Sequence, residues 1–541
     1  MSTDTKNQLV QGLMEGTLSR WEFVTRAVAL GLTAGAVGSL LTAYDAATGA
    51  RAEAAGSMKG QLVIAINSNV PKEAQDALNT AYKARQPNVT LVWDVKNYTD
   101  PSQYTSYLGT QLAASHIRPD IVSGNYQPNF RGYVNFDQYR KSTNPYTGHT
   151  WDRDLNWDFF RGTNTQGERI MLATQSVHIN WFYNKDLFAK AKVEAPRTWA
   201  QFVDVCAKLQ KAGITPVASN YIYMVPQWFA EIYFDQYHIN WVNTVRAHPG
   251  DWNYDPTLDG KFMFNPRDPN IHNKYTYSPQ RFYKGILDGK LRFDTPEVAD
   301  LVKNMAAVFP RYATKDFFVI ADPYTPFLQQ QVAIMTNGSW SLPTLTNDLA
   351  SLSPARLKEL KIKPGAVRTF TWGTFENPPM QGALVKSPVR SVESASGEYV
   401  SIVGKTQQQT NLALDLLQFW LSKPGYQPYL SGYAKSGRFT PAGPLAVEGV
   451  EYPAADQKLF RQVRFLGNAE ASYNGAWTSF VGGDIQKDQF GLLQNALQGK
   501  ITPQQYGKQL QDYTMKNFDA ILKQARLTRA DIANPAKQPG T

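Results

Sequence analysis

Residues 180–219 decide the fold, and they read NWFYNKDLFAKAKVEAPRTWAQFVDVCAKLQKAGITPVAS. The β-branched and aromatic run that ends at Tyr183 predicts a buried strand. Thr198 is a candidate N-cap for the helix that follows. The apolar face of that helix is expected to carry Phe202, Val205, Cys206 and Leu209. Gly213 ends the helix, and the next apolar run predicts a second strand. This order of elements indicates an α/β lobe with a largely parallel sheet.

Three motifs inside this stretch are typical of one protein family. They are Tyr183-Asn184-Lys185-Asp186, Pro196-x-Thr198-Trp199 and Gly213-Ile214-Thr215-Pro216. The stretch closely resembles the block that opens the second lobe of the extracellular solute-binding proteins of ABC importers, in the group that contains the maltose-binding protein. Further blocks resemble the same family in the same order, at residues 119–123, 287–297, 327–340, 398–421 and 494–506. The resemblance implies an α/β, two-lobe periplasmic binding protein fold of type II, with hinge crossovers.

The order of these blocks also implies a domain organisation. A first crossover between the lobes is expected at residues 177–181, and the return crossover lies in the block that starts at residue 398. Residues 221–278 are rich in aromatics, Asp, Asn and Pro, and they look like an insertion into the second lobe. We expect an export signal at 1–54, a first lobe at 55–179 and 396–445, and a second lobe at 180–395 and 446–541.

Composition sets limits on the function. A chain of 541 residues is too long for one core, and its formal charge of +10 contains no basic run dense enough for nucleic acid. The single cysteine, Cys206, excludes an internal disulfide and a thiol-based metal site, and its place on an apolar helix face predicts a buried thiol. The aromatic content of 13% offers stacking surfaces for flat ligands such as sugar rings.

The N-terminal residues have the features of an export signal. Residues 27–41 are apolar and too short to span a bilayer comfortably. The preceding segment 19–24 resembles a twin-arginine signal in which Trp21 replaces the second arginine, so the general secretory route also stays open. Small residues at 50–54 fit a cleavage site, and the region has no cysteine for a lipid anchor. We therefore expect an exported protein, periplasmic or at the cell surface.

Other chemistry finds little support in the sequence. Gly404-Lys405-Thr406 resembles the end of a phosphate-binding loop, but Tyr399 stands where that loop needs glycine. The acidic loop at 251–255 lacks the glycine and the glutamate of a calcium loop, and an aromatic surface loop is favoured there. No cofactor and no metal site are expected. A secreted glycan-active enzyme stays open as the alternative, because a glycoside hydrolase needs only two carboxylates beside an aromatic groove.

The resemblance implies a non-catalytic function. Two lobes would close on a small-molecule ligand, most simply a mono- or oligosaccharide, and deliver it to the ABC permease subunits in the membrane. The protein is expected to be a monomer. Polyamines, glycerol phosphates and acidic sugars stay open as ligands.

The candidate site residues have two origins. Trp340 and Trp477 match cleft aromatics of the family, and in relatives the first of these stacks on a sugar. The others lie at the ends of predicted strands or at the first crossover, where His178 would face the cleft or only the hinge. The candidate ligand-binding residues are Trp340, Trp477, Asn125, Tyr126, Asp94, Asn67, Asn69 and His178.

Overall fold

The computed structural model describes most of the chain. The described residues are 58–68, 70–96, 98, 101–127, 130–157, 168–320, 322–436, 441–464, 466–469, 473 and 483–540. The expected export signal and two of the candidate site residues, Asn69 and Trp477, lie outside this part.

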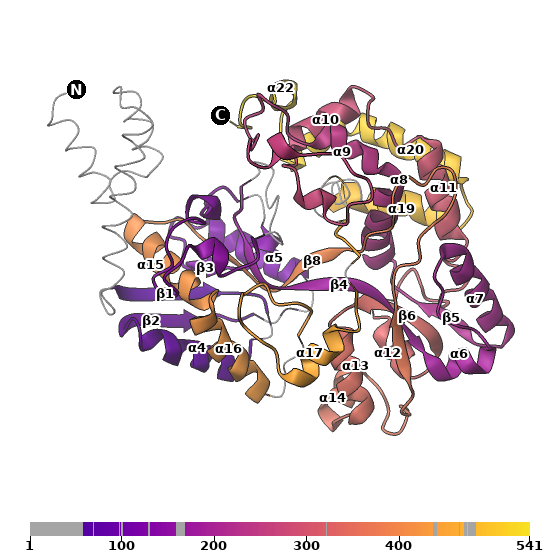
Figure 1. The fold of residues 1–541 in the computed structure, drawn as a ribbon, viewed down its shortest axis with the longest axis horizontal. Coiled ribbons are helices and arrows are strands. Elements are labelled where there is room, and N and C mark those ends of the chain that lie inside the picture. Colours follow the sequence, from indigo (N-terminus) through magenta and orange to yellow (C-terminus); the bar gives the residue numbers. More distant parts are fainter. Residues whose placement is uncertain are drawn as a thin grey trace.

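The long strand β4 (Leu172–Asn184) is the backbone of the fold, because it belongs to both halves of the molecule. Its first half pairs antiparallel with β8 (Glu393–Ile402), from Leu172 opposite Val400 to His178 opposite Glu393. From Ile179 onward it pairs instead with β6 (Val332–Gly338) and β7 (Trp372–Phe375). One strand therefore carries the chain from one group of strands into another, which Figure 1 shows at the centre of the molecule.

The first lobe is built on a sheet in the order β2-β1-β3-β8. Strand β1 pairs in parallel with both β2 and β3, and β3 pairs antiparallel with β8. Helices from two distant parts of the chain, residues 72–113 and 407–435, lie around this sheet, so a later segment completes the lobe (Figure 1). Its strands and helices are β1 (Lys59–Ala65), α4 (Lys72–Lys83), β2 (Asn88–Trp93), α5 (Pro101–Ala113), β3 (Ile121–Val122), η1 (Gly124–Tyr126), η2 (Phe136–Gln138), η3 (Trp151–Arg153), α15 (Gln407–Trp420) and α16 (Lys423–Lys435).

The second lobe contains the rest of β4 with β6, β5 and β7, and Figure 1 shows it on the other side of the molecule. Strands β5 and β6 are parallel, but β4 pairs antiparallel with β6. The two strands that flank α7, β4 and β5, therefore run in opposite directions, and the parallel arrangement expected from the strand-helix-strand order is wrong for this pair. The elements around this sheet are α6 (Lys185–Ala191), α7 (Trp199–Lys211), β5 (Thr215–Ala218), α12 (Tyr324–Leu328), α13 (Ser341–Ala350), α14 (Pro354–Glu359) and α17 (Ala454–Phe460).

An outer group of helices enlarges the second lobe. Most of it comes from the segment after β5 and from the C-terminal residues, which pack together through a large shared core (Figure 1). Its elements are the π-helix η5 (Met224–Phe229), α8 (Ala230–His238), η6 (Ile239–Trp241), α9 (Val242–Val245), η7 (Asp259–Lys261), η8 (Ile271–Asn273), α10 (Pro279–Leu287), α11 (Pro296–Ala306), α19 (Gly483–Leu497), α20 (Pro503–Lys516), α21 (Phe518–Gln524) and α22 (Arg529–Ala533).

A further segment, residues 441–450, also connects the two lobes. The backbone of Leu445 bridges Gln175 of β4, and the Gln175 side chain accepts a hydrogen bond from the Ala442 N–H at 2.7 Å. The Ser176 N–H donates to the Pro444 carbonyl at 2.9 Å. In the described residues, β4, β8 and this segment are the three connections that a movement between the lobes would bend.

Several local predictions are confirmed. The Thr198 hydroxyl caps α7 by accepting from the Gln201 N–H, and Gly213 follows that helix with a φ of +75°. Cys206 is fully buried, and burial raises the pKa of its thiol. The strand predicted to end at Tyr183 is longer than expected, since its first half contains polar residues that bond to β8 and to residues 441–450.

The acidic side chains of residues 251–255 have partners within the protein. In the acidic loop, Asp251 pairs with Arg281 at 2.5 Å, and Asp255 accepts bonds from Thr257 and Leu258. No group of three potential metal-binding side chains occurs among the described residues. In the same part of the chain, no helix is both long and apolar enough to cross a bilayer.

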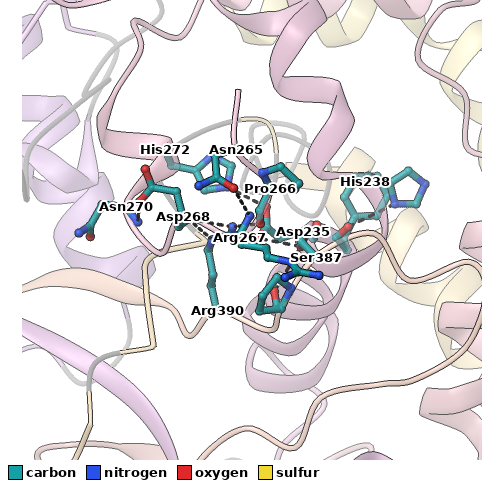
Figure 2. Close-up of polar contacts among 12 residues, drawn as sticks. Asp235, His238, Asn265, Pro266, Arg267, Asp268, Asn270, His272, Ser387 and Arg390 are labelled. Atoms are coloured by element: carbon teal, nitrogen blue, oxygen red, sulfur yellow. Dashed lines mark hydrogen bonds and ion pairs between the residues drawn. The ribbon is translucent and has the colours of Figure 1, made fainter. Parts of the chain in front are cut away.

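A buried ionic cluster anchors the insertion to the second lobe (Figure 2). Arg390 donates to the Asp235 carboxylate at 2.7 Å and to the carbonyls of Pro266 and Asp268 at 2.6 and 2.9 Å. His272 bonds the other oxygen of Asp235 at 2.7 Å, and all three ionisable side chains are about 1% exposed or less. Although burial by itself raises the pKa of Asp235, His272 and Arg390 lower it to about 2.

This cluster predicts a large effect of Arg390→Met. The variant leaves the Asp235 carboxylate without its guanidinium and removes the donors to two carbonyls, so the free energy of unfolding should fall by about 3–5 kcal/mol. Urea unfolding followed by circular dichroism measures this loss. The control is Arg368→Met, because Arg368 is exposed and should change stability little. Equal stability of the two variants would contradict the anchoring function of the cluster.

His238 predicts a specific pH dependence. Its ring stacks on Phe234 with centroids 3.9 Å apart, and burial lowers its pKa to about 3. In the unfolded chain the His238 imidazole binds a proton below about pH 6.5, whereas in the native state it does so only near pH 3. Stability therefore falls as the pH decreases through this window. The contribution should reach about 2 kcal/mol by pH 5. Between pH 8 and pH 5, the free energy of unfolding in urea should fall by about 2 kcal/mol less in His238→Phe than in the parent protein. The exposed-site variant His116→Asn should show the same fall as the parent protein.

Candidate functional site

The topology of the first lobe brings the ends of three strands to one edge. Strands β1, β2 and β3 are parallel, so residues 66–67, 94–96 and 123–126 leave the sheet on the same side. Carboxyl ends of parallel strands are the usual place for ligand groups in open α/β sheets. Asn67 and Lys96 form an isolated parallel bridge at this edge, which continues the pairing of β1 with β2.

Asn67 and Tyr126 are in direct contact. The Asn67 amide donates to the Tyr126 hydroxyl at 2.8 Å, and the Asn67 N–H donates to Ser123 Oγ at 2.9 Å. The Tyr126 ring packs edge-on against Tyr104, with centroids 4.8 Å apart. Neighbouring Asn125 carries a buried side-chain oxygen that has no hydrogen-bond partner among the described residues. The sequence placed Asn125 and Tyr126 after one predicted strand and Asn67 after another, and in the structure Asn67 and Tyr126 are hydrogen-bonded.

Asp94 lies in a charged group at the same edge. One carboxylate oxygen pairs with Lys96 Nζ at 2.7 Å, and the other accepts from the Tyr107 hydroxyl at 2.7 Å. Lys96 Nζ also lies 4.9 Å from the Tyr107 ring centroid. Burial raises the pKa of Asp94, but Lys96 and Tyr107 lower it more, so its net shift is downward. The carboxylate is therefore held ionised and oriented, with both Asp94 and Lys96 partly exposed.

His178 lies where β4 changes partners from β8 to β6. Its side chain is 5% exposed, and its Nε2 lies 2.9 Å from Glu393 Oε1, which also accepts from Ser176 Oγ at 3.1 Å. The His178 N–H donates to Ser339 Oγ at 3.0 Å, and the Ser339 hydroxyl in turn donates to the Ala442 carbonyl. These bonds join β4, β8, the end of β6 and residues 441–450. Of the two alternatives that the sequence left open, this geometry favours the hinge.

Trp340 follows the end of β6 and is half-buried. Its indole lies flat against Gly338, since a Cβ added there would come within 2.3–2.5 Å of three ring carbons. Glycine is therefore required at 338 so that the ring can cover the end of the strand. The indole is neither fully exposed nor enclosed in the core, which leaves part of it accessible to a ligand.

Trp340 is one of three neighbouring aromatic side chains, which we call the aromatic row. Trp228 lies 6.2 Å from Trp340, and Tyr223 lies 5.2 Å from Trp228, between ring centroids. All three rings are half-buried. Tyr223 and Trp228 sit at and within the π-helix η5, and such helices are frequent at functional sites. Sequence reasoning missed both residues, although it noted the aromatic insertion; their position directly after β5 was the available signal.

Two hollows of the described residues lie elsewhere. One is lined by residues of α13 and by residues 349–369, and the other by the end of α8 and the start of α11. Neither contains any candidate residue or any ring of the aromatic row. The candidate residues therefore fall into two groups, the strand ends of the first lobe and the aromatic row of the second.

Comparison with known proteins identifies the family. The family model of the bacterial extracellular solute-binding proteins matches residues 66–427, well over half of the chain. No curated protein matches the sequence. The family supplies a binding component and not an enzyme, so the expected non-enzymatic function stands and the glycoside hydrolase alternative loses its support.

Solved structures agree on the fold at low sequence identity. A family 1 extracellular solute-binding protein from Bifidobacterium longum subsp. infantis is 15% identical, with a TM-score of 0.55 over 85% of this chain and 100% of its own. The cyclic α-maltosyl-1,6-maltose binding protein from Arthrobacter globiformis is 14% identical, with a TM-score of 0.53 over 86% and 99%. An ABC transporter solute-binding protein from Agrobacterium radiobacter K84, in complex with ribitol, is 16% identical, with a TM-score of 0.50 over 85% and 99%. The predicted fold class is confirmed.

The packing of Trp340 on Gly338 predicts the effect of Gly338→Ala. The new methyl group must displace the indole, so the environments of Trp340 and of neighbouring Trp228 should change. In protein labelled with 5-fluorotryptophan, the ¹⁹F resonances of these two residues, assigned with Trp340→Phe and Trp228→Phe, should shift. Gly491→Ala is the matched control because its added Cβ meets no atom within 4 Å. Unchanged resonances in Gly338→Ala would contradict this packing.

Proposed function

We propose that this chain, which belongs to the bacterial extracellular solute-binding protein family and is the solute-binding component of an ABC transporter, captures a carbohydrate by closure of its two lobes. The aromatic row of Tyr223, Trp228 and Trp340 carries this proposal. Sugar rings have apolar C–H faces that stack on aromatic planes, and several adjacent rings suit an oligosaccharide better than a single small ion.

The polar edge of the first lobe supplies the complementary chemistry. Asp94 and Lys96 place an acceptor and a donor side by side, and Asn67, Asn125 and Tyr126 add amide and hydroxyl groups. Adjacent hydroxyls of a sugar donate and accept hydrogen bonds in pairs, which such a set can satisfy. We propose Trp340, Asn125, Tyr126, Asp94 and Asn67 as ligand-binding residues, together with Asn69 and Trp477, which lie outside the described residues.

Closure would bring the two groups together. A ligand that contacts both lobes favours the closed state, because only that state completes its contacts. We propose the lobe boundaries 55–179 and 396–445 for the first lobe and 180–395 and 446–541 for the second, with export directed by residues 1–54. The loaded form would then dock on ABC permease subunits as a monomer.

The ligand class is testable by thermal shift. Raffinose, malto-oligosaccharides, ribitol, galacturonate and spermidine should be compared, because a cognate ligand at a hundred times its Kd adds about 2.7 kcal/mol of stability. We expect stabilisation by an oligosaccharide. Mass spectrometry of the recovered sugar should show it unchanged, and a cleaved product would overturn the binding function. Stabilisation by spermidine alone would overturn the carbohydrate proposal.

The binding residues are testable once a stabilising sugar is found. Trp340→Ala and Trp228→Ala should each weaken binding about tenfold or more in isothermal titration, which corresponds to ~1.4 kcal/mol. Asp94→Asn should weaken it through lost hydrogen bonds. Trp241→Ala and Asp76→Asn are the matched controls, being a half-buried indole outside the aromatic row and an exposed carboxylate. Equal losses in the controls would argue against these site assignments.

A further inference from the structure

The last described residues of the chain are held against the insertion by one buried glutamine. Gln280 in α10 is 1% exposed, and its side-chain oxygen accepts from Trp252 Nε1 at 2.6 Å. Its amide nitrogen lies 2.6, 3.2 and 3.1 Å from the carbonyl oxygens of Asp531, Asn534 and Lys537. The backbone N–H of Trp252 donates to the Pro535 carbonyl at 3.0 Å. Residues 534–540 therefore form a defined segment on the second lobe, which we call the strap.

The far end of the strap contacts the first lobe. Gly540 has a φ of +76°, and a Cβ added there would lie 2.5 Å from Nη2 and 2.8 Å from Nη1 of Arg131. The Arg131 guanidinium thus lies directly against the backbone of Gly540. Arg131 is fixed to the first lobe, because the next residues bond to the chain after β8: the Gly404 N–H donates to the Gly132 carbonyl at 2.7 Å, and Tyr133 bridges Val403.

The strap is also fixed to the second lobe close to this contact. The Gly540 N–H donates to the Asp531 carboxylate at 3.1 Å, and Asp531 is part of the capping box of α22. Figure 1 shows the C-terminal end beside α22, on the side of the second lobe nearest the first. One short segment is consequently anchored by Gln280 and Asp531 on one lobe and meets Arg131 on the other.

We propose that the strap is a non-covalent tie across the outside of the hinge that limits how far the two lobes separate. It adds a fourth connection to β4, β8 and residues 441–450, but one made by side-chain contacts that can break. Apparent ligand affinity is lower when most of the free protein is in the open state. A tie that reduces the population of the open state would therefore raise ligand affinity. The inference rests on the hinge motion of the proposed function, and not on the identity of the ligand.

The test is an interlobe distance measured without ligand. Spin labels at Thr80→Cys in α4 and Lys211→Cys in α7 report on the two lobes, since both positions are exposed. Native Cys206 is the only other cysteine and is buried, so it stays unlabelled. Double electron–electron resonance should give a longer and broader distance distribution for Arg131→Ala and for Gln280→Leu than for the parent protein.

The controls separate a tie from general damage. Arg85→Ala removes an exposed arginine of the same lobe away from the strap and should leave the distribution unchanged. Arg131 is also exposed, so Arg131→Ala should fold normally. The test therefore stays valid even where Gln280→Leu lowers stability. A parent-like distribution in Arg131→Ala overturns the proposal. Because no ligand is present, this failure is distinct from a negative thermal-shift screen, which concerns the carbohydrate function.

Discussion

The fold depends on the change of partners along β4. Up to His178 the strand completes the sheet of the first lobe with β8, and from Ile179 it begins the sheet of the second with β6 and β7. Backbone hydrogen bonds on the two sides of this point are satisfied within different lobes. The chain between them therefore needs few tertiary contacts to stay ordered, and this small number of contacts is compatible with a hinge at this point. The polar bonds of His178, Glu393 and Ser339 then fix how the hinge strands lie against residues 441–450.

A different interaction, between buried charged groups, organises the enlarged second lobe. Its insertion is attached through buried charges: Asp235 is compensated by Arg390 and His272, and Arg390 also satisfies two insertion carbonyls. A buried ion pair of this kind adds little net stability compared with apolar packing, but losing one partner is costly. The cluster therefore specifies where the insertion sits. The insertion in turn contacts Gln280 through Trp252, and its η5 segment carries Tyr223 and Trp228.

Much of the fold was predictable because its signals are local. Thr198 caps α7, Gly213 follows it in a left-handed conformation, and the apolar face of that helix is buried, all at the spacing that the sequence indicates. The first half of β4 was missed since its polar residues conceal a strand whose partners are 215 residues away, as for His178 and Glu393. Within the candidate site, strand-end residues such as Asn67 and Tyr126 were found by topology, whereas Tyr223 and Trp228 were not, because a π-helix has no clear sequence pattern.

The sequence by itself determined α7 with its cap and its end, the α/β class, the family and the buried state of Cys206, since capping, periodicity and motif spacing act over a few residues. The tertiary structure alone decided that His178 contacts Glu393, that Asp94 is paired with Lys96 and Tyr107, and that Trp340 lies in a row with Trp228. These outcomes depend on side chains from distant segments meeting in one place. No local pattern encodes such a meeting, because it is fixed only when the whole core packs.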